Sequence, residues 1–224
     1  MPRDGVAVRG QRLGQVRAVK MVKPVYRKLR RAYNRRFGPG RLRRMMAGSG
    51  PRKIVIGSSM RHDPSWTPTD REFLDLLIPG DWSRAFPPNS LDAMLAEHVW
   101  EHLPAEGARD AAATCFKYLK PGGYLRIAVP DGLHPDASYL DLVGVGTSRN
   151  DHKVLYTYRT LRELFERVGF RVHLHEYFDE AGTFHHSPWD DDAAGRIWRS
   201  ERRDKRNRDG KLNFTSIILD AIKD

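Results

Sequence analysis

Residues 90–132 limit the fold of this chain more than any other stretch. Leu91 to Ala96 is an apolar run with the composition of a strand buried on both faces. Residues 105–119 follow a helical pattern, and Tyr124 to Val129 is a second apolar run. Two buried strands joined by a helix form a right-handed βαβ unit in a mostly parallel sheet. The stretch therefore predicts an α/β fold.

The residues between this helix and its following strand, Lys120 to Gly123, are typical of a helix end. Proline cannot continue a helix, and glycine accepts the left-handed backbone that closes one. Polar residues also follow both strands: Glu97 and His98 after the first, and Asp131 after the second. Ligands of parallel sheets bind at the carboxyl ends of strands, so we expect these three residues to border a site.

The segments SLDAMLAEHVWEHL and YLKPGGYLRIAVPD resemble the central part of class I S-adenosylmethionine-dependent methyltransferases. They are most similar to small bacterial predicted methyltransferases of the Methyltransf_11 type, and the resemblance extends over residues 53–223. It implies a Rossmann-like class I methyltransferase fold. That fold has a seven-stranded, mostly parallel sheet with an antiparallel last strand and helices on both faces. The resemblance is specific for the fold and much less so for the substrate.

The glycine-rich loop of this family corresponds to Gly57, Ser58 and Ser59, which follow a short apolar strand, Ile54 to Ile56. Glycine lets the backbone pass close to the cofactor. Relatives more often have a second glycine where this chain has Ser59. The next strand is predicted near residues 65–69, and the nine-residue connection is too short for a full helix.

The resemblance also implies the remaining cofactor contacts. Asp70 is expected to accept hydrogen bonds from the ribose hydroxyl groups, although taken alone it is more typical of a solvated loop carboxylate or a helix cap. Residues 73–78 are expected to form the third strand. Asp81 and Trp82 lie where family members bind adenine, and Glu97 is expected near the methionine end of S-adenosylmethionine.

Four residues are candidates for catalysis: Glu97, His98, His134 and His152. A general base must titrate near neutral pH, which favours His134 and His152 in the loop-rich insertion after Asp131. This insertion, residues 133–160, and the excursion at residues 179–211 are both longer than the sheet connections need. We expect them to cover the methyl acceptor.

The sequence does not predict a metal site. His98 and His102 stand four apart, but His98 follows a strand, and there is no cysteine pair or HExxH pattern. His185, His186 and the acidic residues 190–192 are more typical of a solvated loop. The chain also lacks a P-loop, a nucleophile elbow and a CxxC motif, which leaves kinase, hydrolase and redox functions unsupported.

The charge distribution divides the chain at about residue 50. Residues 1–53 hold 17 Lys or Arg and one acid, whereas residues 54–224 hold 22 bases and 27 acids. We therefore predict a basic N-terminal arm, residues 1–50, and a methyltransferase-like catalytic domain, residues 51–224. The single cysteine, Cys115, fits a reducing compartment, and the first residues lack the apolar region of a secretory signal. We expect a cytoplasmic protein, with the membrane periphery as an open alternative.

The arm is predicted to contain one amphipathic helix, from Pro24 to Phe37, with Gly38 at its end. Val25, Leu29, Tyr33 and Phe37 share one apolar stripe, and arginines surround it. Packing of the stripe on the catalytic domain or on a second subunit is the favoured interpretation. An anionic membrane surface and RNA are the alternatives.

These observations predict an S-adenosylmethionine-dependent methyltransferase that acts on a small-molecule or glycan acceptor. Two alternatives stay open. The altered glycine loop also fits a degenerate cofactor-binding or interaction module, and the basic arm also fits an RNA-directed methyltransferase.

Overall fold

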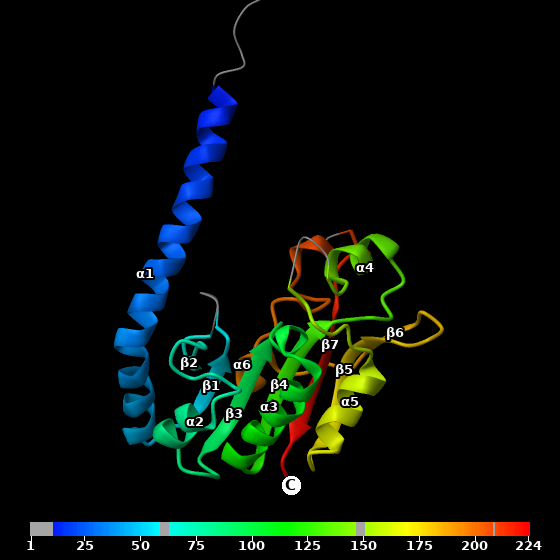
Figure 1. Ribbon diagram of the computed structural model, residues 1–224. Helices are drawn as coiled ribbons and strands as arrows, with labels where there is room; N and C mark the ends of the chain where they lie inside the picture. The colour runs from blue at the N-terminus through cyan, green and yellow to red at the C-terminus, as the bar shows by residue number, and fades with distance from the viewer. Residues whose placement is uncertain (1–10, 59–62, 147–150, 208) are drawn as a thin grey trace, which may run out of the picture.

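The computed structural model describes residues 11–58, 63–146, 151–207 and 209–224. One seven-stranded sheet forms its centre (Figure 1). The strands are β1 (Lys53–Ile56), β2 (Thr67–Pro68), β3 (Leu91–Glu97), β4 (Leu119–Pro130), β5 (Arg171–Phe178), β6 (Phe184–His186) and β7 (Ser216–Ile222).

The strand order is β2-β1-β3-β4-β7-β5-β6. Strands β2, β1, β3 and β4 are parallel to one another. Strand β7 pairs antiparallel with β4 and with β5, and β6 pairs antiparallel with β5. Strand β5 therefore runs in the same direction as β4. This confirms a mostly parallel sheet with an antiparallel last strand.

The βαβ unit at the centre of the sheet is confirmed. Helix α3 (Ala105–Tyr118) connects β3 to β4, and the two strands pair in parallel. Leu91 pairs with Leu119 and Ala93 with Tyr124, so residues 120–123 bulge out of the ladder. Gly122 has a φ of 78°, and its N–H donates to the Lys223 carbonyl at 2.6 Å. The left-handed residue is the reason for glycine at this turn.

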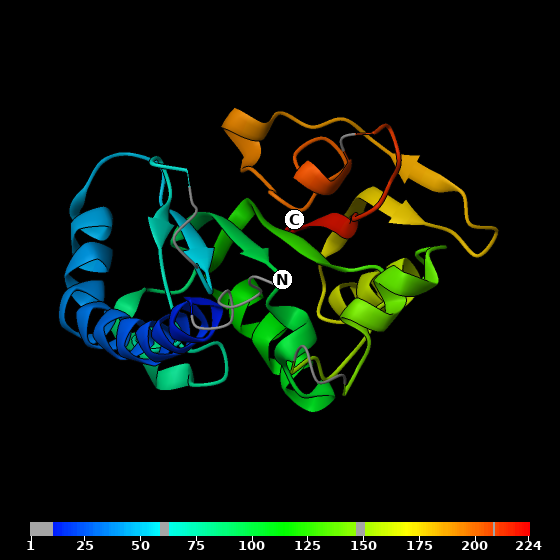
Figure 2. The same cartoon turned by 90° about the horizontal axis from the view of Figure 1, so that it is seen from above.

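Helices cover one face of the sheet, which we call the helical face. Helices α2 (Pro79–Ala85), α3 and α5 (Tyr158–Glu166) place Trp82, Cys115 and Phe165 against buried residues such as Met94 and Ile127. Figure 2 shows α3 and α5 as a layer on one side of the sheet. Most of the apolar core lies on this face.

The opposite face, which we call the loop face, is covered by residues 187–207. Trp66 and Ile197 pack there on Val55, Leu95 and Ile218. In the described part of this segment the regular elements are α6 (Asp191–Ala194) and the 3-10 turn η2 (Lys205–Asn207). The sheet therefore has irregular chain where we expected a second layer of helices (Figure 2). Two further elements, η1 (Trp100–His102) and α4 (Ala137–Val143), follow β3 and β4.

The expected third strand is absent from the described chain. Residues 71–77 form turns, in which the N–H groups of Phe73 and Leu74 donate to the Asp70 carbonyl. Leu74 and Leu76 are buried without joining the sheet. Strand β2 is therefore the sheet edge, and it is shorter than predicted. Pro68 fits this edge because it has no N–H to offer a further strand.

Helix α1 spans Gln11–Ala47, so the predicted bounds of Pro24 and Phe37 were wrong. Its later part packs on the core through Gly38 and the buried Leu42. A Cβ atom at Gly38 would lie 2.5 Å from the Phe73 ring, so this glycine permits close packing and does not end the helix. No helix of the described residues is long and apolar enough to cross a membrane.

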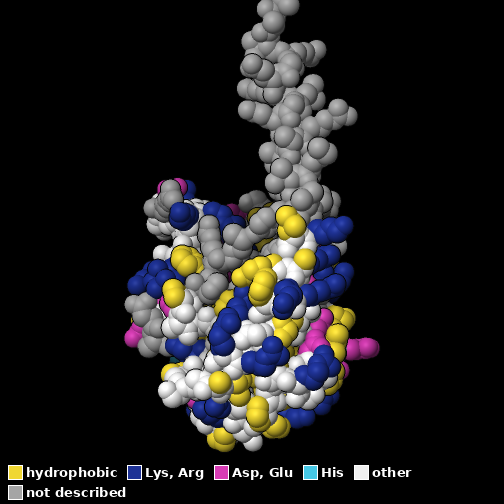
Figure 3. Space-filling view, turned by 90° about the vertical axis from the view of Figure 1, so that its left-hand side faces the viewer, with side chains coloured by type: hydrophobic (Ala, Val, Ile, Leu, Met, Phe, Trp, Pro, Cys, Tyr) yellow, Lys and Arg dark blue, Asp and Glu magenta, His cyan; other side chains and the backbone are white. Residues whose placement is uncertain are grey.

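The exposed stripe of α1 differs from one part of its favoured interpretation, packing on the catalytic domain, while packing on a second subunit stays a prediction. Leu29, Tyr33 and Phe37 are 66%, 54% and 50% exposed, so they do not pack on the catalytic domain. Figure 3 shows hydrophobic side chains beside Lys and Arg on this side of the molecule. Arg36 lies over the Phe37 ring and Arg41 over the Tyr33 ring.

Candidate functional site

A cavity of about 510 Å³ opens at the carboxyl ends of β1 and β3, on the loop face. Its sheet side includes Val55, Gly57, Ser58 and Glu97. Its other side is formed by residues 196–206, whose lining side chains include five bases: Arg196, Arg199, Arg203, Lys205 and Arg206. The cavity therefore brings together three predicted site residues with a basic wall that the sequence did not predict.

Gly57 is a position where backbone conformation and close packing together favour glycine. Its φ is 65°, in the left-handed region. A Cβ atom would lie 2.8 Å from Cγ2 of Val99, which is closer than such atoms approach in proteins. The next residue, Ser58, donates its N–H to the Thr69 carbonyl at 2.9 Å. The end of β1 is thus held against β2, with its backbone open to the cavity.

Glu97 joins the sheet edge to the basic wall. Its carboxylate accepts the N–H of Arg199 at 2.8 Å and that of Trp198 at 3.2 Å. The Arg199 guanidinium lies 3.7 Å from the same carboxylate. Burial raises the pKa of Glu97, and these donors oppose the rise only in part. Glu97 therefore positions residues 198–199 over the cavity.

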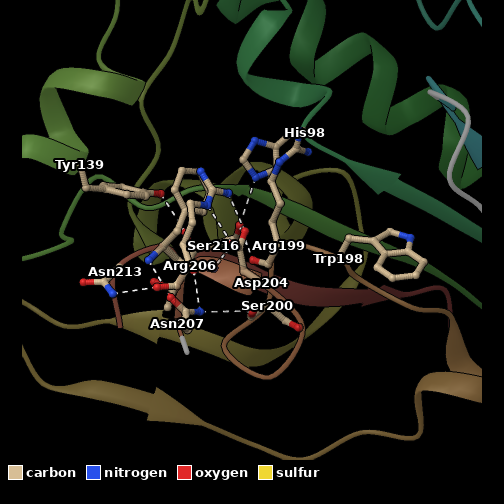
Figure 4. A network of polar contacts seen from close by, with 12 residues as sticks. His98, Tyr139, Trp198, Arg199, Ser200, Asp204, Arg206, Asn207, Asn213 and Ser216 are labelled. Atoms are coloured by element: carbon tan, nitrogen blue, oxygen red, sulfur yellow. Dashed lines mark hydrogen bonds and ion pairs between the residues drawn. The ribbon is translucent and has the colours of Figure 1, made fainter. Parts of the chain in front are cut away.

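His98 follows Glu97 with an unusual backbone, at a φ of 54°. Its Nε2 lies 3.1 Å from Oγ of Ser216, and that hydroxyl group donates to the Arg199 carbonyl at 2.9 Å (Figure 4). Because the serine proton is used by a carbonyl, Nε2 must carry the histidine proton. Burial lowers the pKa of His98 well below its usual value, which keeps the ring neutral. Its Nδ1 is then an unprotonated nitrogen.

A network of hydrogen bonds holds the basic wall in place (Figure 4). The Asn207 amide donates to the carbonyls of Glu201 and Phe214, and its oxygen accepts the Phe214 N–H at 2.8 Å. Arg206 pairs with Asp204, and Asn213 donates to the Arg206 carbonyl at 2.7 Å. These contacts close residues 198–214 on themselves, so the wall is ordered without a long helix.

The other predicted cofactor residues lie outside this cavity. Asp70 is buried and accepts a hydrogen bond from Asn34 of α1 at 3.2 Å. Asp81 accepts the Asp75 N–H and pairs with Arg84. Trp82 is fully buried between Phe86 and Tyr118, and its indole N–H donates to the Asp75 carbonyl. Their assigned roles stay predictions, and Ser59 lies outside the described residues.

The two predicted histidine bases have different surroundings. His134 is buried, and both ring nitrogens are engaged: Nδ1 accepts the Asp136 N–H and Nε2 lies 2.9 Å from the Leu212 carbonyl. Burial lowers its pKa. His152 places Nδ1 2.7 Å from the Val143 carbonyl, while its Nε2 faces Glu101 at 3.9 Å. The insertion thus delivers His152, but not His134, to the end of β3.

Glu101 is the residue that the sequence analysis missed. Its side chain is 1% exposed, and burial raises its pKa to about 7. The sequence showed an acid between two histidines in EHVWEH. It did not show that η1 turns this acid inward, because that depends on packing with residues more than 40 positions away.

A comparison with protein families identifies a methyltransferase domain in this chain. The family model described as "Methyltransferase domain", Methyltransf_23, matches residues 32–175. A methyltransferase from Archaeoglobus fulgidus, described as SAM-dependent, is 17% identical, with a TM-score of 0.45 over 83% of this chain and 92% of its own. An O-methyltransferase family protein from Burkholderia thailandensis is 14% identical, with a TM-score of 0.46 over 88% and 59%. No curated protein matches the chain.

Proposed function

The chain belongs to the methyltransferase-domain family, whose methyl donor is S-adenosylmethionine, and from this premise we propose that the cavity between β1, β3 and residues 196–206 is where the donor binds and reacts. The acceptor we propose is a small molecule or a glycan. The observation that carries the proposal is that Gly57 and Glu97 line one cavity, although 40 residues separate them in the chain.

The cavity has the properties that this cofactor requires. Its volume of about 510 Å³ lies in the range of small-molecule sites. The Gly57 backbone is open to it, with no room for a side chain, and Val55 and Leu95 supply apolar wall. When bound, S-adenosylmethionine supplies the electrophile: its S–CH₃ bond breaks, the acceptor heteroatom bonds to the methyl carbon, and S-adenosylhomocysteine and a proton are released.

The contribution of the protein is then mainly to position the reactants and exclude water. Glu97 fixes the backbone of residues 198–199 over the cavity, and the hydrogen bonds of Asn207 close the wall behind it. The five bases of that wall favour an acceptor that carries negative charge. Arg203 and Arg206 already pair with Asp191 and Asp204, so the excess charge is smaller than the number of bases suggests.

Calorimetry with S-adenosylmethionine and S-adenosylhomocysteine tests this assignment. We expect wild-type protein to bind with a dissociation constant in the micromolar range, and Gly57→Ala to bind at least about tenfold more weakly because of the clash with Val99. Gly182→Ala is the matched control. Its φ of 75° imposes the same backbone strain, but nothing lies near its added Cβ atom.

The absence of binding by wild-type protein at millimolar cofactor would contradict the proposal and favour an interaction module. If binding holds, transfer of a labelled methyl group into metabolite, glycan and RNA fractions identifies the acceptor class. Label that enters RNA alone would overturn the small-molecule or glycan assignment.

A second role is supported by helix α1. We propose that its exposed stripe, Leu29, Tyr33 and Phe37, binds an anionic membrane surface, because apolar side chains flanked by arginines fit the interface between headgroups and acyl chains.

Wild-type protein should bind anionic vesicles and lose binding as salt rises, whereas a variant with serine at all three stripe positions should not bind. Binding to RNA without vesicle binding, or dimerisation through the stripe, would contradict this role.

A further inference from the structure

The end of β3 carries a buried carboxylate without a hydrogen bond. Both side-chain oxygens of Glu101 are inaccessible, and no donor of the described residues reaches either oxygen with hydrogen-bond geometry. Three histidines surround it: Nδ1 of His98 lies 3.1 Å from Oε1, and Nε2 of His102 and of His152 each lie 3.9 Å from it. An unpaired buried carboxylate is costly, and a bound cation would offset that cost.

When the surrounding histidine rings are neutral, they offer Glu101 no positive charge. Nδ1 of His152 lies 2.7 Å from the Val143 carbonyl, and Nδ1 of His102 lies 2.8 Å from a carboxylate oxygen of Asp151. The Val143 carbonyl is an acceptor, so Nδ1 of His152 carries the proton and its Nε2 presents a lone pair toward Glu101. The contact of His102 with Asp151 lacks hydrogen-bond geometry, and Nε2 of His102 faces Glu101 as well. His98 likewise presents an unprotonated Nδ1, because its Nε2 donates to Ser216.

This arrangement has the form of a metal site. Histidine ligands usually donate their other ring nitrogen to a carboxylate or a backbone carbonyl, which fixes the ring and directs the free nitrogen at the ion. The ligand atoms of Glu101, His102 and His152 all lie within 4.8 Å of one another. Ligands about 2.1 Å from a tetrahedral ion are about 3.4 Å apart, so small side-chain shifts would complete the coordination.

We propose that Glu101, His102 and His152 bind one divalent transition-metal ion. Two imidazole nitrogens and one carboxylate suit Zn²⁺, Mn²⁺ or Fe²⁺ better than Mg²⁺ or Ca²⁺, which prefer oxygen ligands. Three protein ligands leave a coordination position open, and the His102 side chain, which is 37% exposed, connects the site with solvent.

A role for the ion follows from its place at the carboxyl edge of β3, and this part rests on the proposed function. Glu97 ends β3 and lines the proposed cofactor cavity, and Glu101 follows four residues later in η1, outside the cavity lining. An ion there would polarise a hydroxyl group of the acceptor and make it a better nucleophile. The acceptor is then expected to be methylated on oxygen.

A second cluster is less suited to a metal ion. Glu176, His186 and Glu201 also bring ligand atoms together. However, one oxygen of Glu176 already accepts the Glu201 N–H, whereas both oxygens of Glu101 lack a hydrogen bond. His186 pairs with Glu201 at 2.9 Å. This cluster therefore serves as the internal comparison for the test.

The test is metal binding by full-length protein, measured without any methylation assay. Protein stripped with a chelator is dialysed against Zn²⁺ or Mn²⁺, and bound metal is counted by elemental analysis and titrated by calorimetry. His102→Asn and His152→Asn keep an amide nitrogen where Nδ1 was, so they retain the contacts with Asp151 and Val143 and remove only the ligand nitrogen. His173→Asn, an exposed histidine on β5, is the matched control.

We expect wild-type protein and His173→Asn to bind one ion per chain and to unfold at a higher temperature with the ion than without it. His102→Asn and His152→Asn should bind at least about tenfold more weakly and lose this thermal shift, and Asp151→Asn should weaken binding by a similar factor. Because His102 is partly exposed, its variant should fold even where the buried His152→Asn does not.

Two results would overturn the site: no stoichiometric binding by wild-type protein, or binding that His186→Asn abolishes and His102→Asn leaves unchanged. Failure of the methyl-transfer proposal would leave this measurement unaffected, because it requires neither cofactor nor acceptor.

Discussion

The two faces of the sheet are built by different means. On the helical face, α2, α3 and α5 bury a large apolar core that includes Trp82, Met94 and Phe165. On the loop face a smaller apolar cluster lies beside the proposed cofactor cavity, and polar contacts hold residues 187–207 in place. The helical face therefore obtains its stability from burial, whereas the loop face combines less burial with directional bonds and leaves room for a ligand.

The contacts of Arg126 illustrate how polar groups stabilise the loop face. Its guanidinium makes two hydrogen bonds to Asp220, at 2.8 and 2.7 Å, and a third to the Gly195 carbonyl at 2.9 Å. His175 adds a contact to Asp220 at 2.9 Å. These partners hold the pKa of Asp220 below its usual value despite burial. Strands β4, β5 and β7 and the segment at Gly195 are thus joined by one polar group.

The largest effect is expected on the helical face. Trp82→Ala should cost about 3–5 kcal/mol of unfolding free energy, because a fully buried ring is lost from the core. Trp82→Phe should retain the fold and bind the cofactor within about twofold of wild type. Urea unfolding and calorimetry measure the two quantities. A stable Trp82→Phe variant that binds cofactor tenfold more weakly would instead place adenine against Trp82.

A somewhat smaller loss is expected for Arg126→Met on the loop face. We expect roughly 3 kcal/mol, the low end for a broken buried ion pair, because His175 stays beside Asp220. Proteolysis should then cut first within residues 187–207, since their anchor at Gly195 is lost. Cleavage that starts among the helices instead would show that the loop face does not depend on this polar connection.

The loop face should also respond to pH through Glu176. Burial raises its pKa from 4.5 to about 8, so the stability that its neutral form provides is complete below pH 4.5 and is lost as pH rises through 8. Glu176→Gln mimics the neutral acid. It should match wild type at pH 4 and exceed it by more than about 1.4 kcal/mol at pH 9. Equal unfolding free energies at pH 9 would show that Glu176 ionises without cost.

The smallest effect concerns the surface of the helical face. Thr157 and Thr160 cap α5 reciprocally, each side chain accepting the other's N–H, at 3.3 and 3.0 Å. Thr157→Ala should cost about 1 kcal/mol in urea unfolding. Because α5 packs away from the cavity, cofactor affinity should stay the same. An altered affinity would mean that the two faces are coupled more closely than their contacts indicate.

The sequence predicted the centre of the fold well because local and tertiary signals agree there. Leu91 to Ala96, the helix before Lys120, and Tyr124 to Val129 each combine a clear apolar pattern with clear ends. It failed at Gly38, where a glycine that normally ends a helix serves close packing on Phe73. It failed again at residues 73–78, which are apolar enough for a strand but form turns that bury only Leu74 and Leu76.

The site was predictable where it follows from strand ends. Gly57 and Glu97 line the cavity because parallel strands end at one edge. The basic wall and Glu101 were not predictable. The wall depends on how residues 196–206 fold back over the sheet, and the burial of Glu101 depends on contacts with His152 and Lys153 of a distant insertion.

Hydrogen–deuterium exchange with and without S-adenosylhomocysteine tests the central claim, that the cofactor cavity lies between the end of β1 and the loop face. Binding should slow exchange in residues 55–58 and 196–206, on opposite walls of the cavity, and leave α5 unchanged. Protection confined to residues 70–82 would contradict this account, because it would place the cofactor at the β2 edge, beside Asp70 and Trp82 and away from the basic wall.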